Sequence, residues 1–259
     1  MNASVSPLRP SAGNPATRPE LSETLRTAVA ARAAAAREFL QQAVAEFGGA
    51  GELCFANSFG AEDMVLTDLI LGSADAPLPI EIFSLDTGRL PAETYTLIGA
   101  VEQRYRTRLK LYFPEAGAVE HFVRTHGINA FRDSVDLRKA CCQVRKLAPL
   151  RRALAGKKAW ITGLRAAQSV TRSGLPLREF DEGNGLYKLN PLSDWSETEV
   201  WAYIRLHDVP YNALHDQFYP SIGCAPCTRA ISVGEEVRAG RWWWENPETR
   251  ECGLHIKER

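Results

Sequence analysis

Five of the six cysteines in this 259-residue chain are arranged in a pattern that suits metal or thiol chemistry. Cys141 and Cys142 are adjacent, Cys224 and Cys227 form a C-x-x-C pair, and Cys252 stands apart near the end. Four thiolates in two pairs can complete a tetrahedral metal site or ligate an iron–sulfur cluster. A separate thiol is free to act as a nucleophile. The pattern therefore favours a thiol-based enzyme over a module stapled by disulfides.

The adjacent pair bears on the kind of metal site. A helix is expected over residues 135–155, and neighbouring helical side chains point about 100° apart. One small ion would meet both Cys141 and Cys142 with strain, whereas two irons of a cubane cluster occupy different corners. This favours a four-iron cluster. A zinc site, a redox disulfide between Cys224 and Cys227, and scattered buried thiols remain alternatives.

Two basic residues follow the adjacent cysteines at helical spacing. Lys146 lies four positions after Cys142 and Arg145 four after Cys141, so each pair shares a helical face. These cations would offset thiolate charge or contact an anionic substrate. Cys54, in contrast, lies in an apolar run and is expected to be a buried small hydrophobe.

Further cations accompany the separate thiol. His255 follows Cys252 by three positions, and cations near a thiol lower its pKa. Arg238 and Arg241 would share a face if their segment were helical, and paired guanidinium groups suit a phosphate or sulfate. The run Trp242–Trp244 either packs this segment onto the body or forms a surface for a partner.

A strand-to-helix connection supplies a candidate anion site. Residues Ser58–Asp63 (Ser-Phe-Gly-Ala-Glu-Asp) link the apolar run Leu53–Ala56 to a helix expected over Ala61–Leu71. Free N–H groups and the dipole at that helix start favour an anion, to which Ser58 adds a hydroxyl. The loop lacks both G-K-[ST] and G-x-G-x-x-G, which disfavours a Walker loop and a dinucleotide fold.

Strands and helices alternate along most of the chain. Strands are expected at Leu53–Ala56, Ile80–Leu85, Leu109–Phe113 and Ala159–Thr162, and helices at 21–47, 61–71, 91–105, 115–127 and 135–155. Alternation predicts an α/β fold with a mostly parallel sheet flanked by helices. A hairpin is expected over 177–190, followed by a capping box at Ser196–Glu199 that opens a helix.

Ligands bind outside the carboxyl ends of strands in such sheets, and Ser58, Asp86 and Gly163 each follow a strand end. We divide the chain into a disordered tail at 1–20, a domain at 21–235 and a mobile C-terminal segment at 236–259 folded over the active face. The tail lacks the apolar stretch of a secretory signal, and an organelle transit peptide is the alternative reading.

Composition limits the partners. Lysine and arginine total 31, equal to aspartate and glutamate, so the net charge is zero. A protein that coats nucleic acid or an anionic membrane would carry a basic excess. No apolar run approaches the roughly 18 residues of a membrane span. Cysteine usage indicates a cytoplasmic, reducing setting.

The motifs together resemble the assimilatory adenosine 5′-phosphosulfate (APS) reductases, within the wider family of APS and phosphoadenylyl-sulfate (PAPS) reductases. The matching motifs are Ser58–Asp63, Leu85-Asp-Thr-Gly88, Cys141-Cys142-x-x-x-Lys146, Gly163-Leu-Arg165, Cys224-x-x-Cys227 and Glu251-Cys-Gly-Leu-His255. Members that use PAPS typically lack both cysteine pairs, so the resemblance points to the iron–sulfur branch. The fold it implies is similar to that of the adenine nucleotide alpha hydrolases.

The resemblance implies a role for each matched position. Cys252 would attack the sulfur of APS and become S-sulfonated as AMP leaves, and thioredoxin would then free sulfite. Cys141, Cys142, Cys224 and Cys227 would hold a [4Fe–4S] cluster that is not itself the electron donor. Lys146, Arg238, Arg241 and His255 would bind the phosphosulfate, and Ser58, Phe59, Leu85 and Gly163 would frame the nucleotide. Because the chain stops at Arg259, the resemblance implies an external thioredoxin.

Some readings stay open. A PAPS reductase or a dual-substrate enzyme is the main alternative. An RNA-thiolating sulfurtransferase of the ATP pyrophosphatase type is disfavoured by zero net charge and the absence of an S-G-G-x-D-S loop. A non-catalytic zinc-binding interaction module is the alternative outside the enzymes. The sequence leaves open whether the chain forms a homo-oligomer.

Overall fold

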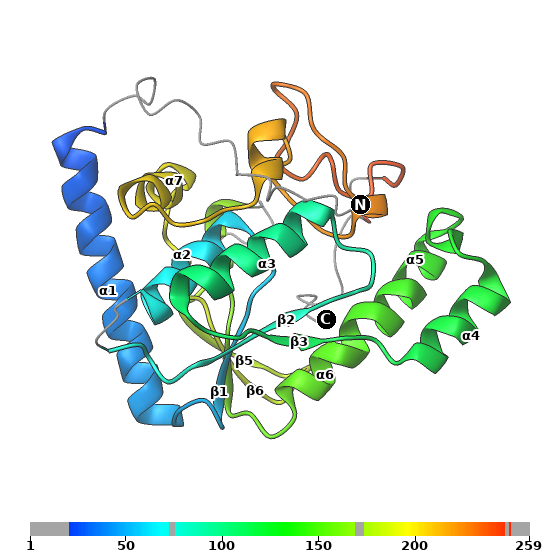
Figure 1. The fold of residues 1–259 in the computed structure, drawn as a ribbon, viewed down its shortest axis with the longest axis horizontal. Helices are drawn as coiled ribbons and strands as arrows, with labels where there is room; N and C mark the ends of the chain where they lie inside the picture. Colours follow the sequence, from blue (N-terminus) through cyan, green and yellow to red (C-terminus); the bar gives the residue numbers. More distant parts are fainter. Residues whose placement is uncertain (1–20, 73–75, 169–173, 247–248, 250–259) are drawn as a thin grey trace, which may run out of the picture.

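The computed structural model describes residues 21–72, 76–168, 174–246 and 249. Its centre is a six-stranded sheet in the order β3-β2-β1-β4-β6-β5, in which only β5 runs antiparallel to its neighbour (Figure 1). The strands are β1 (Leu53–Ala56), β2 (Glu81–Leu85), β3 (Lys110–Tyr112), β4 (Ala159–Ile161), β5 (Arg178–Asp181) and β6 (Leu186–Leu189). The predicted α/β fold with a mostly parallel sheet is confirmed.

Helices cover both faces of the sheet (Figure 1). They are α1 (Glu23–Phe47), α2 (Ala61–Leu71), α3 (Ala92–Tyr105), α4 (Ala116–His126), α5 (Val135–Cys142), α6 (Ala148–Leu154) and α7 (Glu197–Leu206). The connections also contain short 3-10 turns, namely η2 (Ala130–Arg132), η4 (Ala166–Gln168), η6 (Ala213–Gln217) and η7 (Ala225–Cys227). Apart from the helix expected over 135–155, the helices and strands expected from the sequence are present, with ends that differ by at most a few residues.

Alternation along β1 divides the core into two layers. Leu53 and Phe55 point to the face packed by α1, α2, α3 and α7, while Cys54 points to the smaller face packed by α6. Burial on both faces explains why the central strands are apolar throughout. Cys54 is fully buried, as predicted, and burial raises the pKa of its thiol to about 12, which keeps it protonated.

The helix expected over 135–155 is interrupted. A π-helical turn, η3 (Gln143–Leu147), separates α5 from α6 directly after the adjacent cysteines. Pro149 in the first turn of α6 has no backbone N–H, and its ring would crowd the carbonyl of residue 145 in a regular helix. The wider turn relieves that conflict, and π turns are frequent at functional sites.

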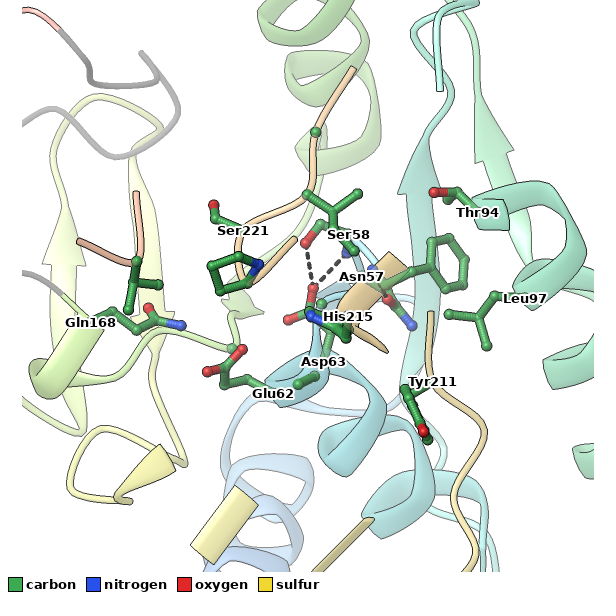
Figure 2. A pocket seen from close by; sticks show the side chains of 18 of the residues that line it. Asn57, Ser58, Glu62, Asp63, Thr94, Leu97, Gln168, Tyr211, His215 and Ser221 are labelled. Carbon is green, nitrogen blue, oxygen red and sulfur yellow. Dashed lines mark hydrogen bonds between the residues drawn. The ribbon is translucent and has the colours of Figure 1, made fainter. Parts of the chain in front are cut away.

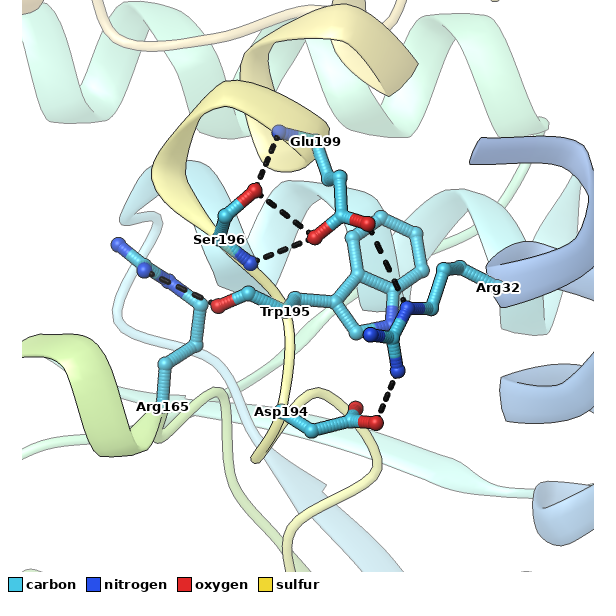
Figure 3. A network of polar contacts seen from close by, with 6 residues as sticks. All are labelled: Arg32, Arg165, Asp194, Trp195, Ser196 and Glu199. Carbon is cyan, nitrogen blue, oxygen red and sulfur yellow. Dashed lines mark hydrogen bonds and ion pairs between the residues drawn. The ribbon is translucent and has the colours of Figure 1, made fainter. Parts of the chain in front are cut away.

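The second half of the sheet ends in the expected hairpin. β5 and β6 pair antiparallel from Arg178–Leu189 to Asp181–Leu186, and β6 then joins β4. The capping box is present at α7, where Ser196 N–H donates to Glu199 Oε2 at 2.7 Å and Glu199 N–H to Ser196 Oγ at 3.2 Å (Figure 3). In the described part of the chain, no helix combines the length and apolar character needed to cross a bilayer.

Candidate active site and cysteine cavity

A large cavity of about 1700 Å³ opens at the carboxyl ends of the central strands. Ser58 follows β1, Leu85 ends β2 and Gly163 follows β4, and all three line this cavity. Phe59 lines it as well. The structure thus brings together the four residues expected to frame a nucleotide, as the strand-end rule predicts.

Hydrogen bonds to one acid shape the loop after β1. Asp63 Oδ2 accepts from the backbone N–H of Ser58 at 2.6 Å and from its hydroxyl at 2.7 Å (Figure 2). Phe59 N–H donates to Asn57 Oδ1 at 2.7 Å, and Phe59 adopts φ 63° although it is not glycine. The left-handed residue turns the chain from the strand into α2. Because the Ser58 hydroxyl donates to Asp63, its oxygen can still accept a hydrogen bond.

Asp63 also explains the glycine after β4. A Cβ atom at Gly163 would lie 2.1 Å from Asp63 Oδ1, far closer than a real contact allows. Burial raises the pKa of the Asp63 carboxyl to about 6, and the hydrogen bonds from Ser58 limit that rise. The loops after β1 and β4 are therefore packed against each other through this carboxyl group.

Arg165 anchors the loop after β4. Its Nε and Nη2 each lie 2.7 Å from Glu62 Oε1 at the start of α2, and its Nη1 donates to Trp195 O at 3.3 Å (Figure 3). The guanidinium group is buried, so these partners satisfy a charge that water cannot reach. All three residues of the Gly163-Leu-Arg165 motif line the cavity, and the ion pair of Arg165 with Glu62 also fixes the loop to α2.

The two cysteine pairs meet in a second, smaller cavity. Cys141 and Cys142 at the end of α5 and Cys224 and Cys227 around η7 all line it. All four are free thiols, so no disulfide joins Cys224 to Cys227 here. Over the described residues, however, no three Cys, His, Asp or Glu side chains converge on one point as a single metal ion requires.

The loop after β2 holds the C-x-x-C segment in place. Thr87 Oγ1 lies 3.1 Å from Cys224 Sγ, and Ala225 N–H donates to Arg89 O at 2.8 Å. Arg145 in the π turn donates to Thr87 O at 2.7 Å, which joins the adjacent cysteines to the same loop. Asp86 does not line the large cavity; its carboxylate accepts from Gly88 N–H at 2.7 Å and from the Tyr95 hydroxyl at 2.9 Å.

Burial and nearby cations shift the pKa values of the thiols in opposite directions. Burial raises the pKa of Cys227 to about 12, and nearby Arg241 and Lys146 work against that rise. Burial also raises the pKa of Cys141, against Arg145 and Arg89. Buried thiols of this kind keep their protons near neutral pH unless a metal replaces them.

Three of the four cations expected to bind the substrate line the cavities. Lys146 lines both, and Arg238 and Arg241 line the large one. Their segment is not helical but forms turns, with Arg241 N–H donating to Arg238 O at 2.9 Å, so the shared helical face considered for the two arginines does not arise. Gly240 packs so closely on Arg229 O that a Cβ would lie 2.3 Å away, a contact that favours this compact turn.

The tryptophan run packs onto the body, the first of its two expected roles. Trp242 is buried, and Trp244 contacts Phe131 with ring centroids 6.0 Å apart. Trp242 N–H donates to Cys227 O at 3.2 Å, which ties the run to the cysteine cavity. Cys252 and His255 lie outside the described residues.

Two residues of this region were missed from the sequence. Thr87 sits inside the Leu85-Asp-Thr-Gly88 motif, in which only Leu85 and Asp86 were given a place in the site. Arg138 lines the cysteine cavity and pairs with Glu245, and its spacing of four from Cys142 was the available signal.

Comparisons with known proteins agree on one family. Residues 52–230 match the phosphoadenosine phosphosulfate reductase domain. The chain is 63% identical to the adenosine 5′-phosphosulfate reductase of Allochromatium vinosum, over 88% of this chain and 86% of that protein. It is 52% identical to the enzyme of the same name from Burkholderia cepacia, over 91% and 94%.

A solved structure supports the same assignment. The PAPS reductase of Candida auris, in a phosphate complex, superposes with a TM-score of 0.63 at 30% identity, over 82% of this chain and 98% of that one. The chain therefore belongs to the APS/PAPS reductase family of oxidoreductases.

Proposed function

We propose that the protein reduces adenosine 5′-phosphosulfate to sulfite and AMP. The observation that carries this proposal is the shared border of the two cavities. Lys146 lines both the cysteine cavity and the cavity at the strand ends, so a cation stands where an anionic substrate and a thiolate-bound cofactor would meet. The relatives from Allochromatium vinosum and Burkholderia cepacia, both named as APS reductases, support the choice of substrate.

The proposed cofactor is a [4Fe–4S] cluster held by Cys141, Cys142, Cys224 and Cys227. The four thiols line one cavity, and the two adjacent cysteines suit different corners of a cubane better than one zinc ion. When bound, the cluster supplies negative charge and a fixed framework beside the substrate, while the electrons come from a dithiol. The surrounding arginines and Lys146 offset its charge.

In the proposed reaction, the Cys252 thiolate attacks the sulfur of the sulfate group. A sulfur–sulfur bond forms, and the bond from that sulfur to the bridging oxygen breaks, so AMP leaves with the electron pair. A thiolate of reduced thioredoxin then attacks Cys252 Sγ, and sulfite leaves with the pair of the sulfur–sulfur bond. The second thiol of thioredoxin displaces Cys252, so the dithiol supplies both electrons.

Cations make this step feasible because an anion approaches an anion. Lys146, Arg238 and Arg241 are proposed to screen the phosphosulfate together with His255, and such preorganised charge is often the largest contribution to catalysis. Ser58, Phe59, Leu85 and Gly163 are proposed to frame the adenosine. The segment 236–259 is proposed to close over substrate and to open for thioredoxin, which hydrogen exchange with and without AMP would test.

The decisive experiment measures sulfite release from APS with reduced thioredoxin, for the wild type and for Cys252→Ser. We expect turnover only in the wild type, and an intact-mass increase of one SO₃ unit after APS alone only in the wild type. Normal turnover by Cys252→Ser would refute the proposed mechanism. Since the Candida auris relative is a PAPS reductase, the assay includes PAPS at equal concentration, and a preference for PAPS would change the assigned substrate.

A further inference from the structure

A buried ion pair ties the helix of the adjacent cysteines to the end of the described chain. Arg138 donates from Nε to Glu245 Oε1 at 2.7 Å and from Nη2 to Glu245 Oε2 at 3.0 Å. The same Nη2 donates to the Thr249 carbonyl oxygen at 2.8 Å. The side chains of Arg138 and Glu245 are 1% and 4% exposed. Removing one partner would leave a buried charge uncompensated, so the two segments are held together strongly.

One end of this pair belongs to the cysteine cavity. Arg138 lies in α5 one helical turn before Cys142, on the same face, and lines the cavity with the cysteines. A change in what fills the cavity acts on α5 through Cys141 and Cys142. It therefore also acts on the position of the Arg138 guanidinium group.

The other end belongs to the segment that leads toward Cys252. The guanidinium carbons of Arg138 and Arg241 lie 4.7 and 4.6 Å from the ring centroid of Trp242, and the backbone N–H of Trp242 donates to Cys227 O. Residues 242–245 are thus bound both to the segment of the C-x-x-C pair and to the helix of the adjacent pair. Thr249, the other partner of Arg138, precedes Cys252 by three positions.

We propose that the Arg138–Glu245 pair couples occupancy of the cysteine cavity to the position of residues 242–246 and 249, which precede Cys252 in the chain. Both are positioning residues: neither lines the large cavity in which the substrate is proposed to bind. A filled cavity fixes α5, and Arg138 then holds Glu245 and Thr249 in place. This inference rests on the proposed function, because it takes the cluster as the occupant of the cavity.

Hydrogen exchange of the full chain tests the coupling. Amide exchange across residues 242–246 is measured for cluster-loaded protein and for protein stripped anaerobically with a chelator and an oxidant, with iron and labile sulfide assayed in each sample. The variants are Glu245→Gln and Arg138→Lys. The second keeps the positive charge but loses the bidentate hydrogen bonding of the guanidinium group. The control is Lys139→Gln, a change at the exposed neighbour of Arg138 on α5.

In the wild type and in Lys139→Gln, we expect stripping to speed exchange across 242–246 by about ten-fold, a typical size for coupling between sites. In both pair variants, exchange should already be fast in loaded protein and should change little on stripping. The amides of α7 serve as an internal reference, since a general loss of stability would raise their exchange too.

Two results would overturn the coupling. One is that removing the cluster from wild-type protein leaves the exchange rates across 242–246 unchanged. The other is that the pair variants respond to removal of the cluster as the wild type does. A wild type that contains no iron or labile sulfide would instead refute the cluster, and the coupling with it. Iron content therefore separates failure of the proposed cofactor from failure of the coupling alone.

Discussion

The hydroxyl oxygen of Thr87 lies 3.1 Å from the sulfur of Cys224. Thr87 belongs to the loop that ends β2, and Cys224 follows it by 137 residues. The same hydroxyl accepts from Arg89 N–H at 3.2 Å, so the backbone of the loop orients it. Hydrogen bonds to a ligating sulfur are among the means by which proteins tune an iron–sulfur cluster.

We therefore expect Thr87→Val to weaken retention of the proposed cluster. The change keeps the shape of the side chain but removes the hydroxyl, and a net hydrogen bond contributes about 0.5–1.5 kcal/mol. Iron and labile sulfide should be lost several-fold faster in air than from the wild type, while far-ultraviolet circular dichroism stays the same. Thr125→Val, an exposed change of the same kind on α4, is the control. Equal loss rates for Thr87→Val and this control would contradict the expected role.

A second prediction concerns the close approach of the loops after β1 and β4. Gly163→Ala would place a methyl group 2.1 Å from Asp63 Oδ1, so the loop at Ser58 must shift. Overpacking of this kind costs about 1–3 kcal/mol. We expect a lower melting temperature and AMP binding weakened by about ten-fold or more, measured by calorimetry, because the displaced loop borders the nucleotide cavity.

The matched control is Gly99→Ala in the middle of α3, where a Cβ meets no atom within 4 Å. Alanine at an open helical position stabilises by about 0.5–1 kcal/mol, so this variant should melt higher and bind AMP normally. If the two alanine variants behaved alike, the close packing of Gly163 on Asp63 would not be what restricts that position.

The strand-end rule made much of the site predictable. The connections after β1, β2 and β4 could be placed at one edge of the sheet because parallel strands end together. Likewise, the chemistry of two cysteine pairs was enough to expect them in one place. Neither inference needed information on how distant side chains pack.

The missed contacts depend on that packing. Arg138 and Glu245 are 107 residues apart, and no local period links them. The π turn at Gln143–Leu147 arises from a conflict between helix propensity and Pro149, which a propensity average hides. The turns around Arg238 follow from tight packing at Gly240, not from any helical signal.

The buried carboxyl of Asp63 predicts a pH dependence of stability. Its pKa is raised from 3.8 to about 6 by burial, so between these values the folded state holds a proton that the unfolded state has lost. The contribution of Asp63 to stability therefore falls as pH rises from about 4 to about 6 and is constant above that. The difference is on the order of 3 kcal/mol.

Asp63→Asn removes this titration, so its stability relative to the wild type should improve as pH rises. Urea unfolding of both proteins at pH 4.5 and pH 7 measures the change, with Asp208→Asn, at an exposed aspartate after α7, as the control. The direction of the change with pH decides the prediction. If the stability of Asp63→Asn relative to the wild type stayed constant or fell as pH rose, burial would not raise the pKa of the Asp63 carboxyl.

The final prediction addresses Lys146, which lines both cavities. Lys146→Gln removes the charge at that border, so formation of the SO₃ adduct on Cys252 in a single turnover should slow by about 10²-fold or more, as when a charge-stabilising donor is lost. Lys146→Arg should keep most of the rate of adduct formation. Lys139→Gln, a change at an exposed position of α5, should leave that rate unchanged. Quenched samples read by intact mass give the rates.

Iron content decides how such a loss is read. A slow Lys146→Gln that retains its iron would place the lysine charge on the substrate side, where it screens the approach of thiolate to sulfate. A slow variant that has lost iron would place that charge with the thiolates, because four of them in one cavity need cations to offset them. An unchanged rate in Lys146→Gln would remove the reason for treating the two cavities as one active site, since Lys146 borders both.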